Sequence, residues 1–237
     1  MAKKNKSSIS LNSLRDYLVQ VSLIIISLLI AVGVDRCNQS VKNERTLDAY
    51  LEAIHKELVE EEEATNNNLG DCEKDIDGLL GAAQGFSSGG DEQLIRAIGS
   101  TAQVFVRGVF RSFSPTSFDV MINSGHGLLM KDLELRQSLS GVMAFRENYI
   151  KADLLRHDEL TLEAIGDFSE YLDLDCLRRV EPAAFLTCLT DRQLAEQNGA
   201  RDLAVLLRHS EIRSFHLQAY QRLLKSVIPM VEAAREK

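Results

Sequence analysis

The sequence predicts an all-α protein: an N-terminal transmembrane helix continues into a long helix, and an antiparallel helical bundle follows. Three observations favour this fold class. Residues 17–34 carry no charged side chain, apolar residues recur every three or four positions over much of the remaining chain, and only three prolines and no tryptophan occur in 237 residues. Recurrence at this spacing places apolar side chains on one face of a helix.

The predicted transmembrane helix is the run YLVQVSLIIISLLIAVGV, residues 17–34. At ~1.5 Å per residue a helix of this length spans roughly 27 Å, about the thickness of a bilayer's hydrocarbon core. The alternative is a cleaved signal peptide, for which Ala31 and Gly33 offer a small-residue cleavage site. The run exceeds the ~7–15 residues of a usual signal-peptide core, which favours a retained anchor.

The charges that flank this run predict its orientation. Residues 1–16 have a net charge of +3, because basic side chains outnumber the one acid: Lys3, Lys4, Lys6 and Arg15 against Asp16. Basic tails stay on the cytoplasmic side. We therefore expect a cytoplasmic tail at 1–16 and an extracytoplasmic helical domain at 35–237, held in a bacterial inner (plasma) membrane with the domain in the periplasm.

Net charge limits the partners of the predicted domain. Subtracting the +3 of the tail from the overall −8 leaves −11 on residues 17–237. So acidic a surface argues against nucleic acid as a partner. Apart from the lipid bilayer around the anchor, the expected partners are another protein or further copies of the same chain.

Helical spacing continues beyond the predicted span. It predicts a helix from residue 35 to about 83, bent or interrupted near 66–70, where asparagines and a glycine lower helix propensity. The glycines and serines of 85–90 predict a turn before a shorter helix at about 92–105. Residues 104–113 alternate partly, but no second strand exists to pair with them, so a helix end or buried loop is expected.

Capping signals delimit the next two helices. Thr116 and Asp119 have the spacing of a capping box, and Gly125 is placed to end that short helix in a left-handed conformation. Asp132 is expected to cap the following helix.

The clearest stripe of the chain runs from residue 133 to about 172 and predicts one long helix with a buried line of apolar side chains. Those positions are Leu135, Leu139, Val142, Phe145, Tyr149, Ala152, Leu155, Leu162, Ile165, Phe168 and Leu172. Their spacing of three and four is typical of a helix in a bundle.

The C-terminal third is expected to be irregular before a final long helix. Pro182 interrupts residues 173–200, Thr190 and Gln193 suggest a capping box, and Asn198 with Gly199 predicts a stop. The last helix is expected at about 201–235, with a kink at Pro229.

The four cysteines allow disulfides in an oxidising compartment. Cys176 and Cys188 lie twelve positions apart around Pro182, where a chain reversal would bring them together, and the alternative is two buried thiols. Cys37 follows the predicted anchor closely and could bridge two copies. No Cys-x-x-Cys pair or cysteine–histidine cluster that would predict zinc occurs.

Two phrases of the sequence resemble a family of uncharacterised bacterial single-pass membrane proteins, classed as a domain of unknown function. They are KNERTLDAYLEAIHKEL at 42–58 and FSPTSFDVMINSGHGLLMKDLELRQSL at 113–139. The family usually carries aromatic and asparagine residues just after the anchor, where this chain has Asp35-Arg36-Cys37-Asn38. The resemblance implies a retained anchor and a helical extracytoplasmic domain, and it implies no activity or cofactor.

Few residues suggest chemistry. Glu52 and His55 have the Glu-x-x-His spacing of di-iron bundles, but the second pair that such a site needs is missing. His209 and His216 share one helix face, which would suit a metal or a pH response. His126, between two glycines, is read as part of a turn.

The sequence therefore predicts no enzyme, no catalytic residue and no cofactor. It favours a membrane-anchored helical interaction or scaffold protein that binds a partner or self-assembles. The alternatives are an extracytoplasmic ligand- or metal-responsive sensor that acts through a separate partner and, less favoured, a metal-dependent enzyme.

Overall fold

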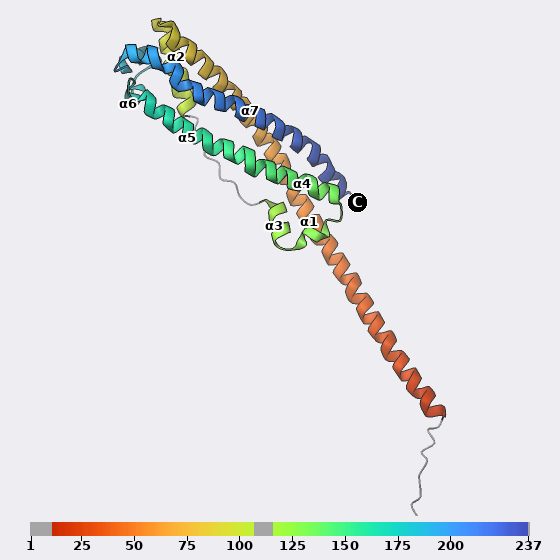
Figure 1. Ribbon diagram of the computed structural model, residues 1–237. Helices are drawn as coiled ribbons and strands as arrows, with labels where there is room; N and C mark the ends of the chain where they lie inside the picture. Colours follow the sequence, from red (N-terminus) through yellow and green to blue (C-terminus); the bar gives the residue numbers. More distant parts are fainter. Residues whose placement is uncertain (1–10, 107–115, 237) are drawn as a thin grey trace, which may run out of the picture. The chain divides into compact units, whose positions relative to one another are not determined.

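The computed structural model describes residues 11–106 and 116–236 (Figure 1), and for most positions between 11 and 37 only the backbone. Every regular element in these ranges is a helix. The one β-type contact there is an isolated antiparallel bridge between Leu172 and Leu189. The prediction of an all-α fold with a helical bundle is thus confirmed.

The chain divides into two units, residues 1–50 and 51–237. The first helix, α1 (Leu11–Ser88), contributes to both. Of the bend or interruption expected near 66–70, the interruption was wrong, because α1 is helical throughout this stretch. Gln221 of α7 donates a hydrogen bond to the side chain of Asn66, and Cys72 is fully buried. Tertiary contacts of this kind outweigh the small propensity cost of asparagine and glycine.

Within the part of the chain that the structure describes, none of the helices has both the length and the apolar character needed to cross a membrane. Most side chains of the predicted span, residues 17–34, lie outside the described set. The span therefore remains a prediction from the sequence.

The second unit continues with α2 (Asp91–Val106). The predicted turn at 85–90 is shorter than expected, because α1 continues to Ser88 and leaves only Gly89 and Gly90 as the link. Gly89 has a φ of +69°, a left-handed conformation that favours glycine. Residues 107–115, which include most of the segment read as a helix end or buried loop, lie outside the described residues.

Two short elements precede the next long helix: α3 (Ser117–Asn123) and η1 (His126–Leu129). Thr116 and Asp119 form the predicted capping box at the start of α3. Gly125 adopts the predicted left-handed conformation, with a φ of +80°. Asp132 caps α4 (Leu133–Phe145) by accepting a hydrogen bond from the backbone N–H of Leu135 at 3.0 Å.

The predicted helix of 133–172 consists of α4, a π-helical turn η2 (Arg146–Ile150) and α5 (Lys151–Phe168). A π-turn accommodates an extra residue, so it changes which face of the following helix meets the core. Leu155 and Leu162, predicted to be buried, are 60% and 69% exposed. Leu154 and His157 are buried instead, so this part of the predicted stripe was wrong.

After α6 (Leu174–Leu177) and the 3₁₀ segment η3 (Pro182–Cys188), the last helix α7 (Arg192–Arg235) begins earlier than predicted. Its cap is Asp191, not Thr190. The predicted stop at Asn198 and Gly199 was wrong, since both lie inside α7. A Cβ atom at Gly199 would lie 2.6 Å from Cγ of Phe86, so glycine here permits close packing against α1.

In the second unit, α7 runs antiparallel to α4 and α5, which follow one another along its side (Figure 1). Pro229 lies within α7, and the helix continues past it. One large apolar cluster joins α1, α2, α5 and α7, where the Phe86 and Phe168 rings meet edge to face with centroids 5.5 Å apart. Cys176 and Cys188, the pair considered from the sequence, form a disulfide with Cα atoms 5.5 Å apart at the edge of this cluster.

Candidate functional site

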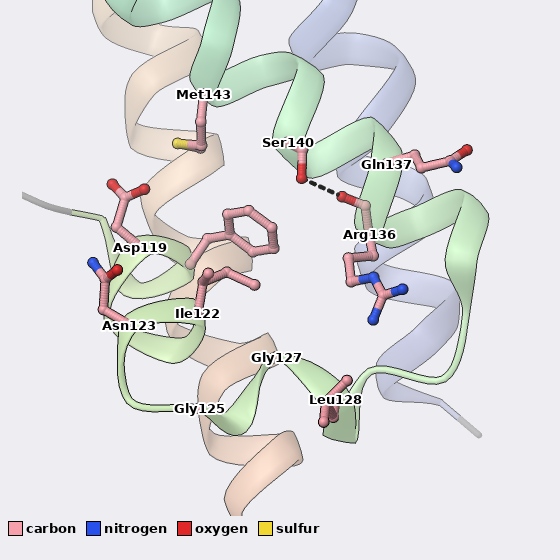
Figure 2. Close-up of a pocket in the computed structure, with 11 residues that line it drawn as sticks. Asp119, Ile122, Asn123, Gly125, Gly127, Leu128, Arg136, Gln137, Ser140 and Met143 are labelled. Atoms are coloured by element: carbon pink, nitrogen blue, oxygen red, sulfur yellow. Dashed lines mark hydrogen bonds between the residues drawn. The ribbon is translucent and has the colours of Figure 1, made fainter.

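A pocket of about 730 Å³ lies between α3, η1 and α4 (Figure 2). Its wall includes four apolar side chains and several polar ones. The apolar residues are Phe118, Ile122, Leu128 and Met143, and the polar ones are Asp119, Asn123, Arg136, Gln137 and Ser140. Apolar and polar side chains therefore both face this pocket, and such a mixture can bind a ligand that has both kinds of group.

Local sequence signals build the α3 side of the pocket. The backbone N–H of Asp119 donates to Oγ1 of Thr116 at 3.1 Å, and the Asp119 carboxylate accepts from the Thr116 N–H at 3.0 Å. Ser117 donates to Glu57 of α1 from its backbone N–H, at 2.8 Å, and from its hydroxyl, at 2.5 Å. These bonds fix the start of α3 relative to α1, so this side of the pocket is held in place.

The tight connection between α3 and η1 shapes the opposite wall. Gly125 turns the chain in its left-handed conformation. A Cβ atom on Gly127 would lie 2.6 Å from Cδ1 of Ile122, so only glycine lets η1 approach α3 this closely without moving that side chain. His126 lies on this turn, with its Nδ1 3.1 Å from the Ser124 hydroxyl, in agreement with a structural role in the turn.

The two charged side chains of the pocket differ in their partners. Oδ2 of Asp119, which accepts from the Thr116 N–H, also accepts a hydrogen bond from the Thr116 hydroxyl at 2.8 Å, so the cap holds this carboxylate at the α3 side of the pocket. The guanidinium of Arg136 forms neither an ion pair nor a hydrogen bond with any residue in the described ranges. It extends from α4 toward η1, whereas Asp119 and Asn123 lie on the far side of the pocket (Figure 2). Arg136 is therefore the charge that the pocket offers to a ligand.

A second group of polar residues lies in the interior between α1, α5 and α7, and is called the polar cluster here. It comprises Cys72, Asp153, His157, His209, Arg213 and His216. Nδ1 of His216 lies 2.7 Å from Oδ2 of Asp153, and Nε2 of His209 lies 3.0 Å from the Asp153 carbonyl oxygen. The rings of His157 and His209 stack at 6.0 Å between centroids.

Burial controls the protonation of two members of the polar cluster. Desolvation raises the pKa of Cys72 to about 11, against the opposing effect of Arg213, so the thiol keeps its proton at neutral pH. Desolvation, helped by the positive charge of Arg213 and by His209, lowers the pKa of His157 to about 4. Neither group is prepared to act as a nucleophile or as an acid near pH 7.

Arg213 is 3% exposed, and its Nε and Nη1 atoms have no hydrogen-bond partner among the residues that the structure describes. Leaving two buried nitrogens of a guanidinium without hydrogen-bond partners is costly in free energy. No signal in the sequence predicted this arrangement, since Arg213 resembles the exposed arginines of α7.

The residues considered as metal ligands are not brought together. Glu52 is exposed and His55 is half-buried on α1. In the described ranges no group of three or more histidine, cysteine, aspartate or glutamate side chains is placed to hold a metal ion. His209 and His216 do share a face, as predicted, and that face meets Asp153. The side chain of Cys37 lies outside the described residues.

Comparison with protein-family models, curated proteins and solved structures finds no match to this chain. The resemblance to a family of bacterial single-pass membrane proteins therefore stays a prediction.

Proposed function

We propose that this protein is a membrane-anchored helical binding protein, whose pocket between α3, η1 and α4 receives a segment of a partner protein. The observation that carries this proposal is the pocket itself. It has a volume of about 730 Å³, exposes apolar side chains, and contains one basic side chain, Arg136, that lacks a partner in the described ranges. A pocket with both apolar and polar lining residues is suited to binding a ligand.

The polar cluster supports binding over catalysis. Its thiol keeps its proton and its most buried imidazole stays neutral at pH 7, for the reasons of burial given above. An active site usually has pKa values shifted toward the working pH, whereas these two shift away from it.

The anchor is proposed from the sequence. Residues 17–34 lack charged side chains, and the preceding residues carry a net +3. These features support a helix retained in the inner membrane, with the second unit on the periplasmic side. Fractionation of cells tests this part: the full chain is expected in the membrane fraction, and recovery in the soluble fraction would contradict the anchor.

The pocket is tested by affinity capture from solubilised membranes. Leu128 is 83% exposed at the pocket, so Leu128→Asp should leave the fold intact and remove the apolar contact. The matched control is Leu162→Asp, which alters a 69% exposed leucine on α5 outside the pocket. We expect a membrane protein, or a second copy of the chain, to be captured by wild type and by the control but not by Leu128→Asp. Equal capture by all three would refute a role for the pocket.

A further inference from the structure

We propose that the segment bound in this pocket is an apolar peptide stretch that carries a carboxylate, and that Arg136 pairs with this carboxylate. This inference rests on the proposed function, because it names the chemistry of the partner for the same pocket. It adds a charge requirement that the apolar lining alone would not impose.

The preference for apolar residues in the bound peptide comes from apolar side chains of the pocket that are exposed to solvent. Ile122 is 43% exposed and Leu128 is 83% exposed, although both are large apolar residues. Phe118, which is 4% exposed, also lines the pocket. Covering such a surface with apolar side chains of a partner is favourable, at ~25 cal/mol per Å² of apolar area removed from water.

Charge complementarity supplies the second requirement. Asp119, the other charged side chain of the pocket, lies on the far side from Arg136 (Figure 2), and its Oδ2 accepts two hydrogen bonds from Thr116. Arg136 has no ionic partner in the described ranges and presents a planar guanidinium that matches a carboxylate through two parallel hydrogen bonds. The pocket therefore favours an anionic group at the Arg136 end and apolar groups elsewhere.

The shape of the pocket favours a peptide over a small amphiphile such as a fatty acid. Sites for small molecules bury most of the ligand surface, about 70–90% of it. Here Leu128 and Ile122 are exposed to solvent, so the hydrocarbon chain of a bound fatty acid would keep much of its surface in contact with water. A peptide can cover the open side with its own neighbouring residues.

The pocket also requires little rearrangement to bind. Capping bonds hold α3, and the close approach of Gly127 to Ile122 fixes η1 against it. A preformed surface loses less conformational entropy on binding than a mobile one.

The test uses the full chain in detergent and a phage-displayed library of random heptapeptides. Wild type is expected to select peptides that combine apolar residues with aspartate or glutamate, and Arg136→Gln is expected to lose the acidic preference. The control is Arg222→Gln, an exposed arginine on α7 that is not part of the pocket. It should select the same acidic peptides as wild type.

Fluorescence anisotropy then measures the affinity of one selected peptide and of a variant peptide in which glutamate is replaced by glutamine. For wild type the acidic peptide should bind about tenfold more tightly, as expected for a charge-assisted hydrogen-bonded pair. For Arg136→Gln the two peptides should bind alike. Added salt should reduce the difference, because it screens exposed charges.

Several outcomes would overturn the inference and leave the proposed function standing. In the first, the library yields no binding peptide; in the second, the selected peptides show no preference for acidic residues; in the third, Arg136→Gln keeps the acidic preference. In each case the capture of the partner would still depend on Leu128. Dodecanoate that binds more tightly than the peptides and depends on Arg136 would also overturn it. Loss of the Leu128 dependence itself would instead refute the proposed function.

Discussion

Two neighbouring sections of the second unit are built from the same three helices but are held together by different interactions. In the apolar section, residues 79–86 of α1 meet 160–168 of α5 and 195–206 of α7 through leucine, alanine and phenylalanine side chains. The polar cluster precedes the apolar section on α1 and α5 and follows it on α7, and its contacts come from cysteine, aspartate, histidine and arginine. Both sections lie on the buried faces of the same helices, although one is apolar and the other polar.

The difference concerns how each section responds to its surroundings. Apolar burial depends little on pH or salt, because the contacts carry no charge. The polar cluster contains titratable groups whose protonation is coupled to folding. We therefore expect substitutions to act most strongly in the apolar section and pH to act mainly through the polar cluster.

The largest effect is expected from Phe168→Ala in the apolar section. Phe168 is 0% exposed, and its ring contacts those of Phe86, Phe105 and Tyr171. Removing the ring leaves a cavity and should lower the free energy of unfolding by about 3–5 kcal/mol in urea denaturation. Leu162→Ala, at an exposed site of the same helix, should change it by less than about 0.5 kcal/mol. Equal losses in the two variants would contradict the assignment of Phe168 to the core.

The next effect is expected from removal of the disulfide beside the apolar section. The double variant Cys176→Ser, Cys188→Ser frees a loop closed over twelve positions. On the chain-entropy model this should lower the free energy of unfolding by about 3 kcal/mol. A reductant should produce a similar loss in wild type and none in the double variant. Insensitivity of wild type to the reductant would show that the bridge does not contribute.

A smaller loss is expected from Gly199→Ala, which tests how closely α7 packs on α1. The new Cβ would meet the Phe86 ring at 2.6–2.9 Å and force it to move, at a cost of about 1–3 kcal/mol. Gly141→Ala on α4 is the matched control, since no atom lies within 4 Å of its Cβ position. It should gain up to about 1 kcal/mol from the higher helix propensity of alanine.

The smallest and most gradual change in the free energy of unfolding is expected from pH, and it should come from the polar cluster and not from the apolar section. The unfolded chain protonates His157 near its ordinary pKa of 6.5, whereas the folded chain holds that pKa near 4. Between these values the unfolded state binds more protons, so this contribution to stability is present above pH 6.5 and falls with decreasing pH. The slope should not exceed about 1.4 kcal/mol per pH unit.

His157→Leu should flatten this part of the pH profile, measured by urea denaturation at a series of pH values. The other groups that face His157 in the polar cluster, namely Arg213 and His209, remain in this variant. An unchanged slope would assign the acid sensitivity to other groups.

Local signals in the sequence predicted more than tertiary ones did. Thr116, Gly125 and Asp132 could be assigned to caps because capping depends on residues within one turn of each other. The predicted helix stop at Asn198 and Gly199 was wrong. Glycine is needed at 199 because the Phe86 ring packs against it, and this contact with a distant residue cannot be inferred from the local sequence. The π-turn at 146–150 has no sequence signature, and without it Leu155 and Leu162 of α5 were wrongly assigned to the buried face, whereas Phe168 was assigned correctly.

The pocket was missed, and of the polar cluster only the shared face of His209 and His216 was predicted. Arg213 and His157 are buried at positions where periodicity arguments expect apolar residues, so a polar interior could not be inferred. The pocket depends on how η1 folds between α3 and α4, and Arg136 gains its importance only from the lack of a partner there. Residues such as Glu52 and His55 attracted notice through a motif that the rest of the chain does not complete.

The burial of Cys72 has a consequence for the chemistry of the Cys176–Cys188 bond. Disulfide exchange begins with attack by a thiolate. Cys72 is 0% exposed and almost wholly in the thiol form, so neither access nor ionisation allows it to attack a sulfur of the bridge. Once formed, the bond is therefore protected from scrambling by this thiol for as long as the helices around Cys72 stay folded.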